Sequence, residues 1–494
     1  MPPPSFSSQS SFQVHAPRGT VALLKEATQA VYAHLQKGSD GGAAWTALQA
    51  LLADLHLDTD MSDPEWIHAP ESERSGTCES IAERLNVDLM DMHGGADVAC
   101  MLRVVEQAAI LLGPGRLIAH WAQALVFPAL SQSHALSYAD VARAHRLCVY
   151  MMLSVPLEVY DGVQDTHAFR TDVSPASDAA LAFTQSVFML YAEGPVPGRH
   201  PALASLDTIL SMYSETRPTP FLHHVALTLS PTCTHLLHAL ILFLQRHTMH
   251  TYHITSTCLL EELLALLVTL DGATVVEEGI KCLVMILPHV PYWLSRPESN
   301  KLPALFRLYA HVVTVFVHAN EHVRLLFSTV YGLFPGVFLW FLRAPDACLA
   351  HLGDSVPWDE NDTLPLQRGS DIYLEHHLVH PQLAKHEPAS DEPAGRMWQH
   401  SDPADLLAMC QRLYVPTTSI PDRDVPLPMA DESGDVRLRS EWRFELYMRE
   451  QLLMHIGCLH RDRIAGTAEE EQQQQLQDTN RMLRTQLQTL QAHM

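Results

Sequence analysis

The stretch of sequence that decides the fold is S-P-T-C-T-H-L-L-H-A-L-I-L-F-L-Q-R-H, from Ser230 to His247. Ser230 followed by Pro231 is a typical helix start, because the hydroxyl caps a free backbone amide and proline suits the first helical position. In the centre of the stretch, leucines together with Ile241 and Phe243 occupy every side of a helix. Such a helix needs neighbours all round. The stretch therefore predicts a buried helix in an all-α protein.

Helical periodicity continues on both sides of this stretch, and no segment alternates as a strand does. Ser137-x-x-Asp140 and Thr274-x-x-Glu277 fit the capping box that begins many helices. We expect an N-terminal HEAT-like α-solenoid, with one large irregular helical domain as the alternative. Further helices are expected at residues 21–35, 45–55, 256–270 and 275–287.

Composition divides the chain into four parts. The first is rich in proline and serine, and the third carries recurrent prolines, with helical pattern only at 372–379 and 404–413. We interpret the third as an extended, partly ordered Pro-rich segment. The predicted parts are a disordered tail at 1–20, the α-solenoid at 21–343, an extended linker segment with short helices at 344–436, and a C-terminal coiled-coil helix at 437–494.

Leu325 to Leu342 is the best candidate for a membrane span, since eighteen residues pass there without a charge. Its centre contains Phe334-Pro335-Gly336, which would break a helix in the middle of the bilayer. We therefore expect two buried helices joined by a turn.

The C-terminal part carries a heptad seam, with apolar residues spaced four and three apart. Asn480 occupies a core position of this seam, where a buried amide favours one register. The seam is short for a stable pair on its own, so we expect it to bind a partner. The predicted partner-binding residues are Trp442, Leu446, Leu453, Ile456, Leu476, Asn480, Leu483 and Leu487.

Charge and motifs exclude several function classes. The 32 basic and 56 acidic residues give a net charge of −24, which repels nucleic acid and offers no obvious patch for anionic lipid. The nine cysteines are not clustered, as expected of reduced thiols in the cytoplasm. Phosphate-binding loops, nucleophile elbows and metalloprotease motifs do not occur. We expect no catalytic residues and no cofactor.

The chain has 30 histidines, several of them spaced so that they could serve as metal ligands. His247, His250 and His253 are three residues apart, and His235 and His238 share a helical face. Steps of three drift around a helix, and no thiol or carboxylate completes a set of ligands at a fixed spacing. Core and loop positions are the simpler interpretation, so no metal site is predicted.

The segment V-Y-G-L-F-P-G-V-F-L-W-F-L-R, from Val330 to Arg343, resembles the hamartin-family pattern L-Y-G-M-Y-P-C-N-F-x-x-[FY]-L-R. Gly336 and Val337 stand where that pattern has Cys-Asn. Residues 279–291, with their L-P-H-V-P ending, the H-P and R-M-W pieces downstream, and residues 443–463 resemble further parts of the family in the same order. The family motif, interpreted as structural, comprises Tyr331, Gly332, Pro335, Phe338, Leu342, Arg343, His380, Pro381 and Trp398.

The resemblance is to the hamartin family, with this chain as a short member of fungal type. It implies a non-catalytic scaffold that stabilises a tuberin-like GAP subunit acting on Rheb, and so restrains TOR complex 1. It also implies a cytoplasmic protein, with peripheral contact to phosphoinositides on lysosomal or vacuolar membranes as a weaker expectation. Self-association through the coil is a further candidate interaction. The alternatives are an unrelated α-solenoid adaptor in trafficking or signalling and a hydrolase or metal enzyme in an unfamiliar helical fold.

Overall fold

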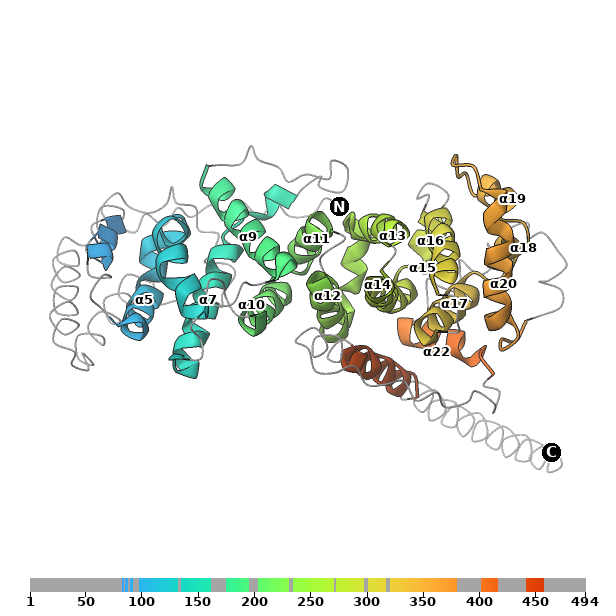
Figure 1. Cartoon of the computed structure of the whole chain (residues 1–494). Helices are drawn as coiled ribbons and strands as arrows, with labels where there is room; N and C mark the ends of the chain where they lie inside the picture. The colour runs from blue at the N-terminus through green and yellow to red at the C-terminus, as the bar shows by residue number, and fades with distance from the viewer. Residues whose placement is uncertain are drawn as a thin grey trace, which may run out of the picture. The chain divides into compact units, whose positions relative to one another are not determined.

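A computed structural model of the chain shows an all-α protein (Figure 1). Among the described residues no strand occurs, and an isolated bridge pairs His377 with Tyr414. The predicted all-α class is confirmed, and the predicted C-terminal coiled coil stays a prediction. The structure describes residues 82–83, 85–87, 89–91, 97–131, 135–160, 175–194, 203–230, 234–270, 272–296, 301–316, 320–379, 401–415 and 441–456.

The chain forms two compact units. The first comprises Met1–Phe243 with His253–Leu266, and the second comprises Leu244–Tyr252 with Leu267–Met494. The predicted helices at 21–35 and 45–55 lie outside the described residues.

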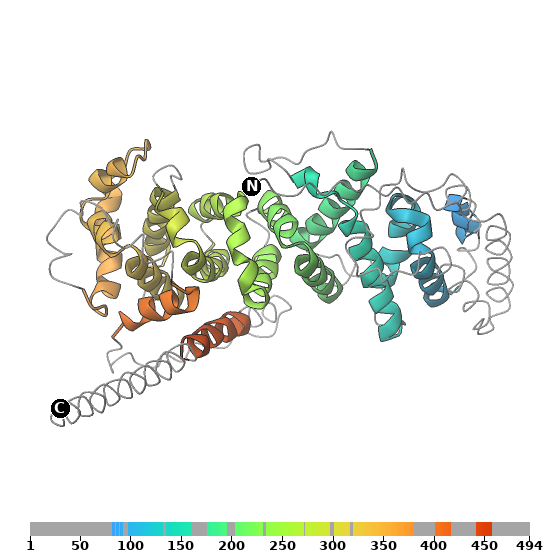
Figure 2. The same ribbon diagram turned by 180° about the vertical axis from the view of Figure 1, so that it is seen from behind.

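In the first unit, helices pack against neighbours in chain order (Figure 2): α5 on α7, α7 on α9 and α10, and both of these on α11. Such stepwise packing is typical of an α-solenoid. The elements are α5 (Val98–Arg116), the π-helix η2 (Leu117–Val126), α6 (Phe127–Ser131), α7 (Tyr138–Leu153), the 3₁₀-helix η4 (Leu157–Tyr160), α9 (Pro175–Glu193), α10 (Leu203–Thr216) and α11 (Pro218–Thr228).

Polar pairs fix the register of these helices. Glu106 of α5 binds two arginines of α7, Arg143 and Arg146. Between α9 and α10, the hydroxyl of Tyr191 donates to Asp207 Oδ1 at 2.6 Å. These bonds cross between helices, so they hold neighbouring helices to one another as well as supporting each helix.

The stretch from Ser230 to His247 contains helix α12 (Thr234–Arg246). Its central residues, from Leu236 to Leu244, are buried on every side, which confirms the prediction of neighbours all round. The 3₁₀-helix η5 (Thr248–Ser256) and α13 (Leu259–Thr269) follow, and they contribute residues to both units. Because η5 takes the residues before Leu259, α13 begins later than the predicted residue 256.

One predicted capping box is confirmed and one is wrong. Ser137 caps α7: its hydroxyl accepts from the Asp140 amide, and it donates to the Asp140 carboxylate. Thr274 does not cap α14 (Ala273–Ile286), because that helix begins one residue earlier, with Gly272 at the cap position. The spacing of a capping box therefore does not by itself fix the first residue of a helix.

The second unit continues the helical packing beyond residue 343. α16 packs on α17 and α20, α14 on α17, and α18 on α19. Its further elements are the 3₁₀-helix η6 (Leu287–His289), α15 (Pro291–Leu294), α16 (Lys301–Val315), α17 (Glu321–Leu333), α18 (Pro335–Arg343), α19 (Pro345–His351), the 3₁₀-helix η8 (Glu360–Asp362), α20 (Thr363–Leu374) and α22 (Pro403–Arg412), with residues 441–456 forming another helix.

Helix positions after residue 343 differ in part from the prediction. α22 matches the helix expected at 404–413, but α20 precedes most of the one expected at 372–379, and α19 was not expected. The reason is that prolines begin these helices instead of breaking them. Pro345 opens α19, and Pro365 lies in the first turn of α20, where a missing amide costs no hydrogen bond.

Candidate partner-binding site

The family motif forms the turn between α17 and α18. The backbone leaves helical geometry at Phe334, and Pro335 takes the first position of α18. The two helices bend by 118° at this point. Phe334 itself is buried, so the turn lies inside the packed unit.

Gly332 allows α22 to pack directly on α17. A Cβ at Gly332 would lie 2.9 Å from Cys410 Cα, a backbone atom that a rotamer change cannot move. The Cys410 thiol lies 3.7 Å from the Thr329 carbonyl oxygen, which shows the same close contact from the other side. Glycine at this position is therefore a packing requirement.

Tyr331 connects α17 to the segment that follows α20. Its hydroxyl donates to the Leu378 carbonyl oxygen at 3.0 Å. The neighbouring backbone pairs with the end of α22, as the Leu378 amide donates to Leu413 and the Val415 amide to His376, each at 2.8 Å. Tyr331 is thus a buried tie between chain segments and has no exposed face.

A serine and a histidine meet at the same place, as in a nucleophile–base pair. Ser328 Oγ lies 2.7 Å from His377 Nε2, and His377 Nδ1 lies 2.7 Å from the Tyr373 carbonyl oxygen. The Tyr373 carbonyl oxygen accepts from Nδ1, and the Ser328 hydroxyl lies between Nε2 and the Arg324 carbonyl oxygen, to which it donates at 2.9 Å. Burial lowers the pKa of His377, and Ser328 has no exposed surface for a substrate. The pair is therefore a structural tie.

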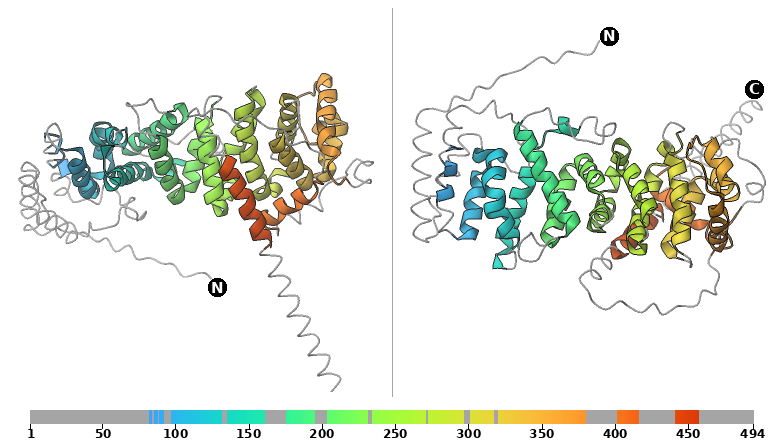
Figure 3. Two further views of the ribbon diagram at one scale, coloured as in Figure 1. Left: turned by 60° about the horizontal axis from the view of Figure 1, so that its bottom comes forward. Right: turned by 45° about the horizontal axis from the view of Figure 1, so that its top comes forward.

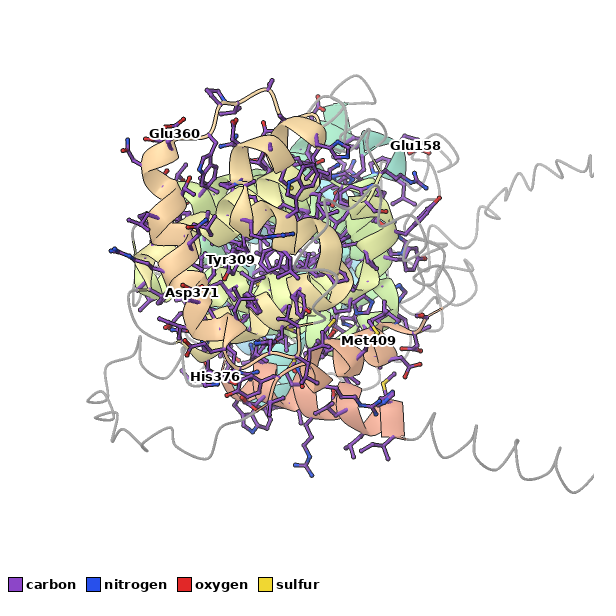
Figure 4. All side chains as sticks on the ribbon, turned by 90° about the vertical axis from the view of Figure 1, so that its right-hand side faces the viewer. Glu158, Tyr309, Glu360, Asp371, His376 and Met409 are labelled. Carbon is purple, nitrogen blue, oxygen red and sulfur yellow. The ribbon has the colours of Figure 1, made fainter. Side chains whose placement is uncertain are left out.

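Phe338 is the centre of an aromatic cluster. Its ring packs against Phe306, Tyr309, Phe327 and Phe341, with centroids 5.0–6.4 Å apart. Such pairs stabilise a core beyond the area that they bury. Tyr309 lies inside this packing, whereas Glu360 and Asp371 lie at the edge of the molecule (Figure 4).

The remaining motif residues end α18 or lie beyond the described part of the chain. Leu342 is buried, and Arg343 is exposed with its Nε donating to the Leu339 carbonyl oxygen. His380, Pro381 and Trp398 lie outside the described residues.

The helix of residues 441–456 docks on the second unit through an ion pair between a buried lysine and a partly exposed glutamate. Lys281 of α14 has no exposed surface, and its Nζ lies 2.6 Å from Glu441 Oε2 and 3.0 Å from Glu278 Oε1. His322 of α17 donates from Nε2 to Glu441 Oε1 at 3.1 Å. The hydrogen bond from His322, assisted by Lys281, lowers the pKa of Glu441 to about 2. We call Lys281, Glu278, His322 and Glu441 the latch. The sequence did not predict the latch, because its members lie far apart in the chain.

Two further residues, Tyr447 and His455, extend the docking along the helix, which is drawn in red beside α22 in Figure 3 (left). The Tyr447 hydroxyl donates to the Met285 carbonyl oxygen at 3.2 Å. Near the other end, His455 Nδ1 donates to Asp405 at 2.5 Å, and its Nε2 accepts from Arg412 at 2.7 Å. The body face of this helix is buried and comprises Phe444, Tyr447, Met448, Gln451 and His455. Its apolar members show a spacing that could have predicted a second contact face.

The predicted coil residues lie on the opposite side of that helix. Trp442 is 65% exposed, Leu453 56% and Ile456 48%, and Leu446 is partly exposed. With 100° between residues, these four point about 180° from the body face. We call them the open face. Leu476, Asn480, Leu483 and Leu487 lie outside the described residues.

No group of three metal-ligating side chains gathers within the described part of the chain. His247 precedes η5, which contains His250 and His253, and the rings of His247 and His250 are 6.3 Å apart. His235 and His238 lie on α12.

Among the described residues, no single helix is long and apolar enough to cross a membrane. α17 and α18 reach that length only as a bent pair.

Comparison of sequences finds mammalian relatives, among them the mouse and human proteins. The chain is 24% identical to mouse hamartin over 271 residues, which are 50% of this chain and 22% of that protein. It is also 24% identical to human hamartin over 263 residues, which are 48% of this chain and 21% of that protein. The match thus spans about a fifth of the length of these curated relatives. No family model matches the sequence.

Comparison of structures finds the same fold in two solved structures. The fold matches a structure described as the TSC1 N-terminal domain with a TM-score of 0.52 and 18% identity, covering 79% of this chain and all of that one. A structure of the TSC1 N-terminal and linker domains matches with a TM-score of 0.51 and 16% identity, covering 88% of this chain and 98% of that one. The chain has this α-helical fold.

Proposed function

We propose that this chain, which is similar in sequence to mouse and human hamartin and shares the fold of the TSC1 N-terminal domain, is the scaffold subunit of a hamartin–tuberin-type complex in the cytoplasm. In this role it stabilises a tuberin-like GAP subunit that acts on Rheb, and it thereby restrains TOR complex 1. The chain itself performs no catalysis. The complex would form through the C-terminal helix, as the sequence predicted.

The observation that carries the proposal is the open face of the helix of residues 441–456. Large apolar side chains on a surface helix that is already docked by its other face form a ready contact for a second helix. Trp442 is the residue we expect to contribute most, because tryptophan supplies a large apolar area with little flexibility.

The test is co-purification with the tuberin-type protein of the same organism. Three forms are compared: the full chain, a chain that ends at residue 456, and one that ends at residue 435. We expect the full chain to retain the partner, the form ending at 456 to retain part of it, and the form ending at 435 to lose it. Thermal unfolding of each form, followed by helical circular dichroism, controls for folding.

A cellular measurement tests the regulatory part of the proposal. Cells that lack this protein should keep phosphorylating TOR complex 1 substrates during starvation, and the full chain should restore the response. If none of the forms retains the tuberin-type protein and starvation responses are normal, the scaffold serves a different complex.

A further inference from the structure

One charged residue lies in the middle of the open face. Trp442, Leu446, Leu453 and Ile456 follow the heptad spacing of four and three, and the position between Leu446 and Leu453 is Arg449. Arg449 is exposed on the same side of the helix. A guanidinium at the centre of an apolar seam specifies what can pack against it.

A second copy of this helix fits the seam poorly. In a parallel, in-register pair, Arg449 would face its own copy in the core of the seam. The flanking positions add to the repulsion, because Glu445 of one helix would face Glu450 of the other on both sides. Both glutamates are exposed. Like charges thus meet at all three places.

We propose that the open face binds a helix of a different protein, which has an apolar seam, a carboxylate facing Arg449 and basic residues facing Glu445 and Glu450. This inference rests on the proposed function, in which the tuberin-type subunit supplies that helix. The carboxylate would form a bidentate pair with the guanidinium, and the basic flanks would fix the orientation of the two helices. The same charges disfavour parallel, in-register self-pairing through this face.

The body face does not take part in this contact. Lys281, Tyr447 and His455 hold the helix on the second unit from the other side, and no open-face residue is among their bonded partners. The helix therefore remains docked when the partner binds. Because the helix is already docked, binding the partner costs less conformational entropy than it would for a free helix.

The first arm of the test measures binding of the tuberin-type protein to the full chain. Arg449→Glu should weaken binding by about tenfold or more, and Arg449→Lys should keep most of it. Glu445→Lys together with Glu450→Lys should weaken binding as well. Wild-type binding that survives Arg449→Glu and the double glutamate variant unchanged would overturn the inference while leaving the proposed function intact.

The second arm needs no partner and uses sedimentation equilibrium of the full chain. Arg449→Leu with Glu450→Lys completes the apolar seam and converts the flanking repulsion into attraction. This variant should dimerise at least about tenfold more tightly than the wild type. The inference fails if the wild type already forms dimers that Trp442→Ala with Leu453→Ala abolishes, or if the converted variant does not dimerise. Failure of the proposed function alone, seen as no binding by the wild type, leaves this arm unaffected.

Discussion

The turn between α17 and α18 and the helix of residues 441–456 belong to the same unit, yet they use apolar residues in different ways. Around the turn, Tyr331, Phe334 and Phe338 are covered on all sides. On the helix, Trp442 and Leu453 are open, while the other side of the same helix is buried. The residues that carry the family resemblance most clearly are therefore core residues. The residues that can meet a partner lie on an element whose sequence is much less distinctive.

The largest contrast between the two regions is expected from truncating an aromatic residue in the core. Phe338→Ala should lower the free energy of unfolding by about 3–5 kcal/mol, because it leaves a cavity among four other rings. Urea unfolding of the full chain measures this. A loss below about 1 kcal/mol would mean that the motif is not part of a tightly packed core.

The buried lysine should show how strongly the helix depends on the body. Lys281→Met leaves Glu278 and Glu441 facing each other and should cost about 3 kcal/mol. Glu441→Gln should cost about 1 kcal/mol, since Lys281 keeps Glu278. Both variants should speed amide hydrogen exchange in residues 444–456.

A double-mutant cycle sharpens this result. If Lys281 and Glu441 interact as the structure shows, the effects of the two substitutions are coupled by about 1–2 kcal/mol. If the two losses of unfolding free energy simply add, Lys281 and Glu441 do not interact.

The close packing at Gly332, next to the turn between α17 and α18, predicts a smaller loss of unfolding free energy. Gly332→Val should cost about 2 kcal/mol, because α22 must shift away from α17. Gly272→Ala is the matched control, as its new methyl group would meet nothing within 4 Å. Equal unfolding curves for the two variants would show that α22 does not pack on Gly332.

Acid should weaken the latch in a defined range. The pKa of Glu441 is lowered to about 2 from an ordinary 4.5, so its contribution is complete above pH 4.5 and is lost as the pH falls toward 2. The difference in unfolding free energy between the wild type and Glu441→Gln should therefore narrow below pH 4.5. A difference that widened on acidification would contradict the latch.

Acid also acts through buried histidines, and this effect is the same in the wild type and in Glu441→Gln. Burial lowers the pKa of His223 and His289 to about 4 and that of His224 to about 3. Because the folded protein favours the neutral form of these histidines, the free energy of unfolding of both the wild type and Glu441→Gln decreases as the pH drops below 6.5.

The smallest effect on stability is expected on the open face. Trp442→Ala should change the free energy of unfolding by no more than about 0.5 kcal/mol, because the side chain is mostly in water. A large loss in urea unfolding would show that Trp442 belongs to the body of the protein, and the comparison between the two regions would fail.

Local sequence signals predicted part of this structure correctly. The all-α class, the buried helix α12, the Ser137 cap and the turn at Pro335 depend on residues close together in the chain, so each can be inferred from its own neighbourhood. Heptad spacing placed Trp442, Leu446, Leu453 and Ile456 on one side of their helix for the same reason, while their binding of a partner stays a prediction. These features need no knowledge of which helices touch.

Features that depend on distant partners could not be predicted. Lys281 and Glu441 are separated by 160 residues, and Gly332 and Cys410 by 78, so no local pattern connects them. Prolines misled the prediction after residue 343, because the same residue that breaks a helix in its interior begins one at Pro345. The predicted cap at Thr274 failed because Gly272 already stood at the start of the helix.

The proposal that links the two regions is that the partner binds the open face while the family motif serves the core. Its most direct test is co-purification of the full chain, carrying Trp442→Ala, Leu453→Ala and Ile456→Ala together, with the tuberin-type protein. The control is Leu452→Ala with Met454→Ala, which removes exposed apolar side chains from outside that face. We expect the triple variant to lose the partner at unchanged stability and the control to keep it. Retention of the partner by the triple variant would contradict the claim.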